Sequence, residues 1–325
     1  MLITLHWRVR TMAESRNVTG SKDDLLADAS RCMLMRFSES SCRLCFDICP
    51  HGAVSLDGGL SINPQQCRGC LLCTAVCPVG ALEQSSDFSA CLARLSKVPE
   101  PILGCVRTNE CSNGTVACLG GLSEEHLLAL CHTLTGRLTL NLSLCGDCPN
   151  NPMITRLRQR LDAISEAGLS DSRCHINFAE SAQDIHYRDE SVDRRSFFKS
   201  FSNALFKNAA VILSATNEQT ERRTEYAGKR LPIRRKLLNS TRNKLSQELV
   251  VRIRKHFDSC VSFDDTCTRC QGCAAICPTG ALQTELSDIP PTFDQLLCTC
   301  CGLCREFCMD GALRISTGNS EDGAG

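Results

Sequence analysis

The sequence predicts an α+β protein in which two small cysteine-rich modules flank a small α/β domain with a parallel sheet. Three observations support this prediction. Four cysteine runs of related spacing lie in two blocks, one on each side of the chain's central part. After the first block, short apolar segments alternate with helical patterns, which is typical of a parallel sheet. The chain has 325 residues, enough for two or three domains.

The cysteine runs are the strongest pattern in the sequence. The stretch from Cys67 to Pro78 reads CRGCLLCTAVCP. The related runs are Cys267, Cys270, Cys273 and Cys277; Cys298, Cys301, Cys304 and Cys308; and a partial copy, Cys42, Cys45 and Cys49. All four runs continue to a Gly-Ala pair, and we expect this glycine to adopt a backbone conformation that a Cβ atom disfavours. Zinc ribbons pair two C-x2-C knuckles and explain neither the third cysteine nor this tail.

The C-x2-C-x2-C-x3-C-P spacing resembles the bacterial 2[4Fe–4S] ferredoxins, and its repetition resembles the polyferredoxins. The resemblance covers about 110 residues in two blocks, 32–85 and 259–316. It implies two [4Fe–4S] clusters in each block, held on two short β-hairpins and two short helices. It also implies that the first three cysteines of a run bind one cluster and the fourth binds the neighbouring cluster.

This cross-over defines four sets of ligands, each named here by one member. The Cys67 set is Cys67, Cys70, Cys73 and Cys49; the Cys32 set is Cys32, Cys42, Cys45 and Cys77. The Cys267 set is Cys267, Cys270, Cys273 and Cys308; the Cys298 set is Cys298, Cys301, Cys304 and Cys277. Cys260 and Cys300 are surplus.

Cys32 is the least regular of these ligands. Glu39 stands where the spacing would place the first cysteine of the partial run, so we expect Cys32 to supply the ligand through an inserted loop. Without Cys32, this set would have three protein thiolates and would hold a [3Fe–4S] centre or a cluster with a labile iron.

Residues 86–180 predict the α/β domain. We expect strands at 101–105, 114–119, 137–145 and 174–181, and helices at 123–134, with Ser123 as N-cap, and at 153–168. Ligands of open α/β sheets bind at the carboxyl ends of strands, and four cysteines fall at or after such ends. Cys105, Cys118, Cys145 and Cys148 are therefore candidates for an additional metal site, with Cys111 as a fifth candidate. The alternative is that cysteine acts as a small buried apolar residue, which suits Cys91, Cys131 and Cys174.

The same stretch resembles the iron–sulfur delta subunit of methanogen-type hydrogenases. The resemblance rests on the cysteines at the predicted strand ends and covers about 80 residues. It implies an additional iron–sulfur cluster in this domain.

Residues 181–258 predict a basic helical connector. The stretch 194–257 contains sixteen Lys and Arg against four Asp and Glu, although the whole chain has no net charge. RRSFFK at 194–199 resembles a twin-arginine export signal and the paired arginines of the accessory ferredoxin of periplasmic nitrate reductase systems. Because the motif is internal, we favour a short amphipathic helix there. Residues 242–257 predict a second, basic helix, and the connector either folds back onto acidic surfaces or docks an acidic partner.

Composition and the chain ends set further expectations. Residues 1–31 are expected to form a polar lead and 317–325 a disordered tail. No segment approaches the ~20 apolar residues of a transmembrane helix, and the first residues do not match a signal peptide. Most of the 26 cysteines have metal-binding spacing and must stay reduced, which favours the cytoplasm.

These patterns predict an electron-transfer protein that passes single electrons between larger donor and acceptor enzymes. Whether the chain is itself an enzyme stays open, but a non-catalytic carrier or an electron-transfer subunit of an oxidoreductase complex is favoured. No G-x-G-x-x-G stands between a strand and a helix, so a bound flavin or nicotinamide is not indicated, and no histidines form a ligand pair. An assembly factor for a metalloenzyme, suggested by RRSFFK, would bind an apo-enzyme without turnover. A redox-sensing regulator, suggested by the basic helix, would bind DNA in a salt-sensitive manner, although nucleic acid is not the expected partner.

Overall fold

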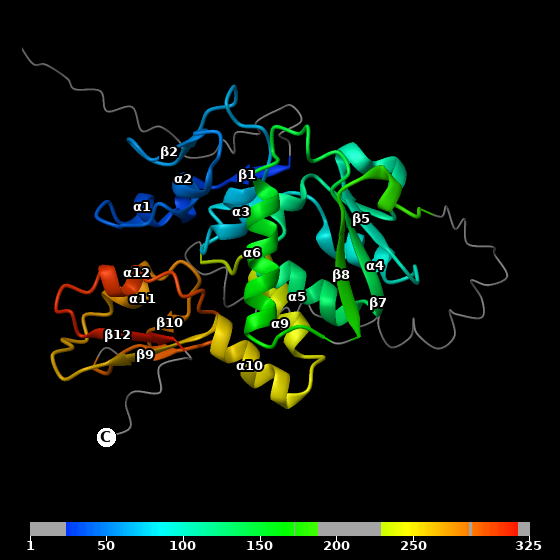
Figure 1. The fold of residues 1–325 in the computed structure, drawn as a ribbon. Coiled ribbons are helices and arrows are strands. Elements are labelled where there is room, and N and C mark those ends of the chain that lie inside the picture. The colour runs from blue at the N-terminus through cyan, green and yellow to red at the C-terminus, as the bar shows by residue number, and fades with distance from the viewer. Residues whose placement is uncertain (1–23, 172, 188–228, 286–287, 318–325) are drawn as a thin grey trace, which may run out of the picture.

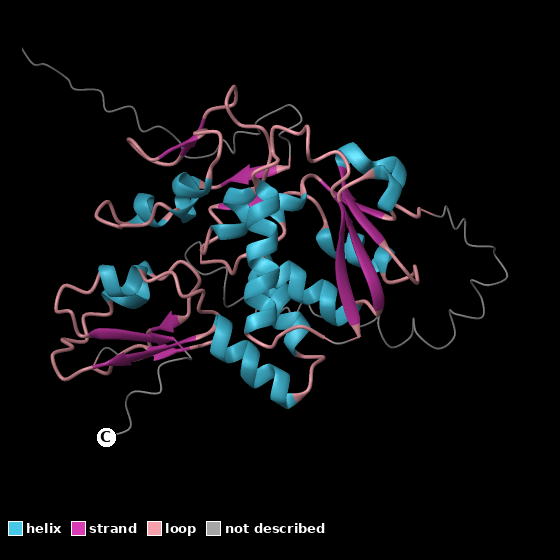
Figure 2. Cartoon of the chain, in the orientation of Figure 1, coloured by secondary structure: helices cyan, strands magenta, loops and turns pink. Residues whose placement is uncertain are grey.

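The computed structural model describes residues 24–171, 173–187, 229–285 and 288–317. Figure 1 shows the first block in blue, the domain with the largest sheet in cyan and green, the connector helices in yellow, and the last block in orange and red. The two cysteine-rich blocks lie on the same side of this sheet domain and face each other through their short helices (Figures 1 and 2).

The first block starts with a strand inside the expected polar lead. β1 (Leu25–Ala27) pairs antiparallel with β4 (Leu82–Gln84), so the module begins upstream of the predicted boundary at Cys32. Between these strands, β2 (Val54–Ser55) and β3 (Ser61–Ile62) form a hairpin. The expectation of two hairpins is thus wrong, because the second pair joins the two ends of the module. The helices of the block are η1 (Ala29–Arg31), α1 (Met33–Arg36), α2 (Leu44–Ile48) and α3 (Leu72–Val76).

The last block repeats this strand arrangement. β9 (Ser259–Phe263) pairs antiparallel with β12 (Leu313–Thr317), and β10 (Leu282–Gln283) pairs with β11 (Thr292–Phe293). The helices α11 (Gly272–Ile276) and α12 (Leu303–Glu306) follow the cysteine loops, as α3 does in the first block. Thr317 ends β12, so it belongs to the module and not to the predicted tail.

The central sheet confirms the predicted parallel α/β domain. Its strands run in the order β6-β5-β7-β8, and all three neighbouring pairs are parallel. The strands are β5 (Ile102–Cys105), β6 (Gly114–Val116), β7 (Gly136–Asn141) and β8 (Cys174–Ala179). β6 and β7 end earlier than predicted, so Cys118 and Cys145 lie in the loops beyond these strands.

The helices of this domain agree with the sequence analysis except for one. α5 (Glu124–Thr133) and α6 (Met153–Glu166) lie where they are predicted, and Ser123 occupies the N-cap position of α5. α4 (Phe88–Leu95) was not predicted; it begins after Asp87, whose carboxylate accepts the Ala90 N–H at 3.0 Å. Three short 3₁₀ segments complete the domain: η2 (Val106–Cys111), η3 (Leu119–Gly121) and η4 (Ala182–Asp184).

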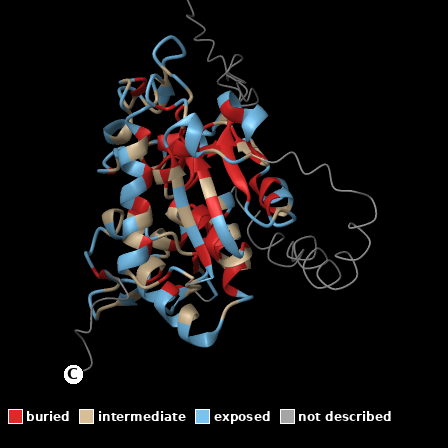
Figure 3. Cartoon of the chain, turned by 45° about the vertical axis from the view of Figure 1, so that its right-hand side comes forward, coloured by how far each residue is buried: buried red, intermediate tan, exposed pale blue. Residues whose placement is uncertain are grey.

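The main core is leucine-rich and centred on this sheet. Leu103, Leu138 and Leu140 come from the strands, and Leu128 and Leu130 come from α5; all five are fully buried. Figure 3 shows this buried region in red. Cys91, Cys131 and Cys174, the cysteines that suit apolar packing, are buried.

The described part of the connector, 229–258, forms two helices where only the helix at 242–257 was predicted. α9 (Ile233–Arg242) ends where the predicted helix 242–257 was to begin, and α10 (Gln247–Phe257) starts after Ser246, whose hydroxyl accepts the Leu249 N–H. Leu238 and Ile253 insert into the main core. The RRSFFK motif lies outside the described residues. None of the described helices is long and apolar enough to cross a bilayer.

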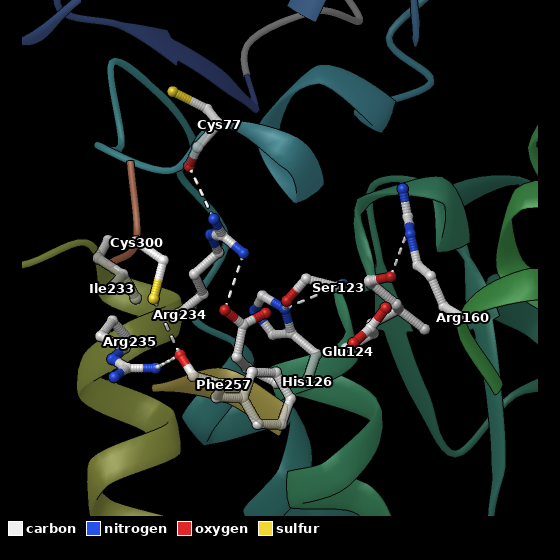
Figure 4. Close-up of polar contacts among 12 residues, drawn as sticks. Cys77, Ser123, Glu124, His126, Arg160, Ile233, Arg234, Arg235, Phe257 and Cys300 are labelled. Carbon is white, nitrogen blue, oxygen red and sulfur yellow. Dashed lines mark hydrogen bonds and ion pairs between the residues drawn. The ribbon is translucent and has the colours of Figure 1, made fainter. Parts of the chain in front are cut away.

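Arginines of the connector fold back onto the rest of the chain. Arg234 forms a 2.8 Å ion pair with the buried Glu125 of α5 and donates to the backbone carbonyl of Cys77 at 3.0 Å (Figure 4). Burial alone would raise the pKa of Glu125, but the charge of Arg234 opposes burial, and the pKa is lowered overall. Arg230 pairs with Glu83 of the first block at 2.8 Å. These contacts agree with the expectation that the connector folds back onto acidic surfaces of the chain itself.

Candidate metal centres

Three of the four cysteine loops share one unusual backbone conformation. A non-glycine residue with positive φ is uncommon, so its recurrence at matching positions identifies one loop design used three times. Such turns direct successive N–H groups into a concave site that favours anionic groups, including iron–sulfur clusters. The positions with their φ angles are Gly69 (64°) and Leu71 (57°), Arg269 (59°) and Gln271 (62°), and Cys300 (56°) and Gly302 (81°). In the partial run, Arg43 has φ −137° and breaks the pattern.

The glycines of the four Gly-Ala tails also share a conformation. Gly52, Gly80, Gly280 and Gly311 have φ of 58°, 63°, 76° and 62°. These values lie in the left-handed region, which a Cβ atom disfavours. The prediction for these glycines is confirmed in both blocks.

The four thiols of the Cys67 set line one cavity. The apolar residues Leu25, Ala53 and Val54 line the same cavity, together with His51 and Arg68. Burial raises the pKa of Cys73, and the neighbouring thiols of Cys70 and Cys67 raise it further. A backbone N–H, that of Ala53, donates to the Cys49 sulfur at 3.3 Å. Four thiols in one cavity, those of Cys70 and Cys73 buried and those of Cys49 and Cys67 half-buried, fit an iron–sulfur cluster. Thiolates bind such clusters, and N–H donation to sulfur tunes them.

The structure also brings the Cys32 set together. Cys32 is buried at the junction of η1 and α1, and α1 lies in the loop between it and Cys42. Burial raises the pKa of the Cys45 thiol to about 12, and its neighbours Cys77, Cys32 and Cys42 contribute in that order. The Cys32 thiol therefore lies near the other three thiols of its set.

Replacement of this thiol gives a direct prediction. In Cys32→Ser, the Cys32 set is expected to give a three-iron EPR signal, because only three thiolates remain, while the signal of the Cys67 set is unchanged. EPR of the anaerobically purified full-length variant measures this. Cys260→Ser, at an exposed surplus cysteine, is the control. A spectrum identical to that of the wild type would show that Cys32 is not a ligand.

In the last block, the thiols gather in two neighbouring groups. Burial raises the pKa of Cys301 to about 12, and Cys277 and Cys304 lie nearby and raise it further. Burial raises the pKa of Cys273 to about 11, with Cys270 and Cys308 as neighbours. Cys267 precedes this loop, and its N–H donates to the carbonyl of Asp264 at 3.1 Å.

Of the two surplus cysteines, Cys300 lies beside the Cys298 set, and its N–H donates to the Cys298 sulfur at 3.4 Å. Cys260 is exposed on β9. The Cys300 thiol accepts a hydrogen bond from the Ser259 hydroxyl at 2.8 Å and donates to the Phe257 carbonyl at 3.4 Å (Figure 4). A hydrogen bond with Cys298, followed by the one from Ser259, lowers the pKa of Cys300 to about 6 although burial opposes this.

The two blocks are joined through the Cys32 and Cys298 sets. Leu303 of α12 is fully buried in the same apolar cluster as Cys32 and Cys77, and Cys301 packs against that cluster. The rings of Phe37 and Phe307 meet edge to face with centroids 5.3 Å apart. Sequence reasoning missed these contacts, because nothing in either run indicates which distant run faces it.

Polar contacts close the edge of the same interface. The hydroxyls of Ser40 and Ser41 both donate to the carboxylate of Glu306, the Ser40 contact at 2.8 Å. Burial would raise the pKa of Glu306, but the two serines outweigh it and lower the pKa. Glu306 is thus held as a charged acceptor between the blocks.

The candidate thiols of the sheet domain are brought together as well. Burial raises the pKa of Cys118 to about 12, and Cys105, Cys70 and Cys145 lie close enough to raise it further. Burial raises the pKa of Cys145 to about 11, with Cys105 and Cys148 as neighbours. The fifth candidate, Cys111, is exposed at the end of η2.

Among the described residues, no three Cys, His, Asp or Glu side chains lie close enough together to hold a single metal ion. This is equally true of the thiols of the Cys67 set. The thiolates of a four-iron cluster bind different irons, so a cluster site needs wider spacing than a site for one zinc ion, whose sulfur ligands lie at about 2.3 Å from the metal.

Comparison with known proteins supports this assignment for the first block. A family model described as 4Fe-4S dicluster domain matches residues 40–81. The match covers both cysteine runs of that block but not Cys32, and it supports iron–sulfur clusters in this part of the chain. No match was found among curated proteins or among solved structures.

Proposed function

We propose that this chain is a polyferredoxin-like electron-transfer protein with four [4Fe–4S] clusters, two in each block. The last block supports this because it repeats the features of the first. Its strand pairs have the same arrangement, its loops have positive φ at the same positions, and its tail glycines share one conformation. The Cys67, Cys32, Cys298 and Cys267 sets would hold the clusters.

The observation that carries the proposal is the order of the sets. Cys45 of the Cys32 set lies among the neighbours of Cys73, and Cys301 of the Cys298 set packs against the core that contains Cys32. Cys273 of the Cys267 set lies among the neighbours of Cys304. The four sets therefore form one continuous row through both blocks.

Bound [4Fe–4S] clusters accept and release single electrons at potentials that depend on burial and on hydrogen bonds to sulfur. The chain's own residues provide those conditions. Leu303 and the edge-to-face rings of Phe37 and Phe307 pack between the blocks. The thiols of Cys32, Cys73 and Cys77 are buried in apolar surroundings. The row suits transfer between a donor and an acceptor enzyme, and the compartment that we propose is the cytoplasm, where thiols stay reduced.

The regulator alternative is weakened by the connector. Arg235 of α9 is buried in an ion pair, Ile253 of α10 is in the main core, and His256 of α10 contacts Glu124 at 2.7 Å. These contacts bury part of the connector's basic charge, while Arg252, Arg254 and Lys255 of α10 stay exposed. Absence of salt-sensitive DNA binding would exclude the regulator.

Iron analysis and reductive titration of the full-length protein test the proposal. After anaerobic purification, we expect about sixteen irons per chain from the four sets and reversible uptake of several electrons from dithionite. Cytochrome c serves as a soluble acceptor for the return of these electrons. Zinc in place of iron, or iron that takes up no electrons, would refute the proposed function.

A further inference from the structure

The sheet domain contains a group of thiols that neither block uses. We propose that Cys105, Cys118, Cys145 and Cys148, the Cys105 set, hold a fifth iron–sulfur cluster placed next to the Cys67 set. The inference extends the proposed function by one redox site at the end of the row. It rests on the sheet topology, on the burial and grouping of the thiols, and on a contact between two loops.

The topology places this set where parallel sheets bind ligands. The chain leaves β5 for β6 on one side and then returns to place β7 on the other side of β5. The strand order therefore reverses between β5 and β7, and ligands of open parallel sheets bind in the crevice beyond the carboxyl ends at such a point. Cys105 is the last residue of β5, and Cys145 lies in the loop that follows β7.

The four thiols converge from three separate loops. Cys105, Cys118 and Cys145 are all buried. Cys105 lies opposite Val116 of β6, two residues before Cys118, and Cys118 and Cys145 belong to the same buried core as Cys70. Cys148 is half-buried, and its N–H donates to the Cys145 carbonyl at 3.2 Å. Other cysteines of this domain are placed differently: Cys91 packs against Gly114, and Cys131 lies beside Cys174.

Two loop contacts hold this set against the Cys67 set. A Cβ atom on Gly120 would lie 2.4 Å from the carbonyl oxygen of Cys70, so only glycine permits this approach of the loop after Cys118. From the loop after Cys148, the Asn150 amide donates to the Arg68 carbonyl at 3.0 Å, and its oxygen lies 3.0 Å from His51 Nε2. Arg68 and His51 belong to the two loops that carry Cys67 and Cys49.

The donor set and its position match an iron–sulfur cluster. Four cysteine thiolates are the usual ligands of both [2Fe–2S] and [4Fe–4S] clusters. The competing interpretation is a redox-active disulfide between Cys145 and Cys148, which have the C-x-x-C spacing of thiol oxidoreductases. That chemistry needs only two thiols and gives no role to the buried Cys105 and Cys118.

The test uses the full-length protein, purified anaerobically, with iron and acid-labile sulfide measured per chain. Cys118→Ala and Cys148→Ala are each expected to lose the iron of one cluster, about two or four atoms, and to keep the iron of the other sets. Cys111→Ala, at the exposed cysteine nearby in sequence, is the matched control and is expected to keep all iron. Because Cys148 is only half-buried, its variant gives a result even where Cys118→Ala folds poorly.

The outcomes separate this inference from the proposed function. Cys273→Ala, in the last block, is expected to lose iron as well. If it does so while Cys118→Ala and Cys148→Ala match the wild type, the fifth cluster is refuted and the electron-transfer proposal stands. A disulfide between Cys145 and Cys148, found by mass spectrometry of the air-oxidised chain, together with unchanged iron, would assign thiol–disulfide chemistry instead.

A separate experiment tests whether the Cys105 set lies next to the Cys67 set. Gly120→Ala is expected to keep the iron content but to change the EPR lines of the reduced protein, because the added Cβ moves the loop away from Cys70. Unchanged lines in a variant of full iron content would refute the proposed proximity of the two sets.

Discussion

Replacement of Asp258 by alanine is expected to lower the free energy of unfolding by about 3–5 kcal/mol, the usual cost of leaving buried charges without their partner. The carboxylate of Asp258 lies 2.5 Å from Arg235 and 2.5 Å from Arg242, and the side chains of all three are at most 4% exposed. The variant leaves two guanidinium groups buried beside each other. Anaerobic urea unfolding measures the effect, or the rate of absorbance loss where cluster release makes unfolding irreversible.

Two further variants make this stability test specific. Asp258→Asn keeps the shape and a hydrogen-bond acceptor but removes the charge, so it should fall between Asp258→Ala and the wild type. Glu248→Gln breaks an exposed pair with Arg252 and should cost no more than ~0.5 kcal/mol. Were Asp258→Ala to behave like Glu248→Gln, the two arginines would not depend on Asp258, and our account of how α9 is anchored would be wrong.

Cys301→Ala is expected to remove the cluster of the Cys298 set, about four irons per chain, and to change the EPR signals of two neighbouring sets. One neighbour, the Cys267 set, belongs to the same block. The other, the Cys32 set, is about 260 residues away in sequence and is adjacent only because Leu303 and Cys301 pack against its core. Neighbouring reduced clusters broaden each other's lines, so loss of one should sharpen both remaining signals.

The control for this variant is Cys260→Ala, at an exposed cysteine of β9 in the same block. It should keep the iron content and all signals of the wild type. Sharpening of the Cys267 signal alone would contradict the contact between the blocks. Iron loss in both variants would show that the block is destabilised and not that a ligand is lost.

Local patterns in the sequence determined much of this protein. The cysteine spacing and the Gly-Ala tails act within about ten residues, so a single loop conformation satisfies them in each of the three complete runs. The central strands and the helices α5 and α6 are also local, since apolar periodicity and the N-cap at Ser123 mark them. α4 was not predicted, because a helix of eight residues leaves only a short periodic pattern in the sequence.

Tertiary structure decided the features that depend on distant partners. β1 is three residues long and forms only because β4 offers its edge, so no local signal marks the start of the first module. The connector helices gain their positions from Leu238 and Ile253 in the core and from arginines paired with Glu125 and Asp258. Which cysteine sets are neighbours is likewise outside the sequence pattern, because a run specifies its own loop and not the surface against which the loop packs.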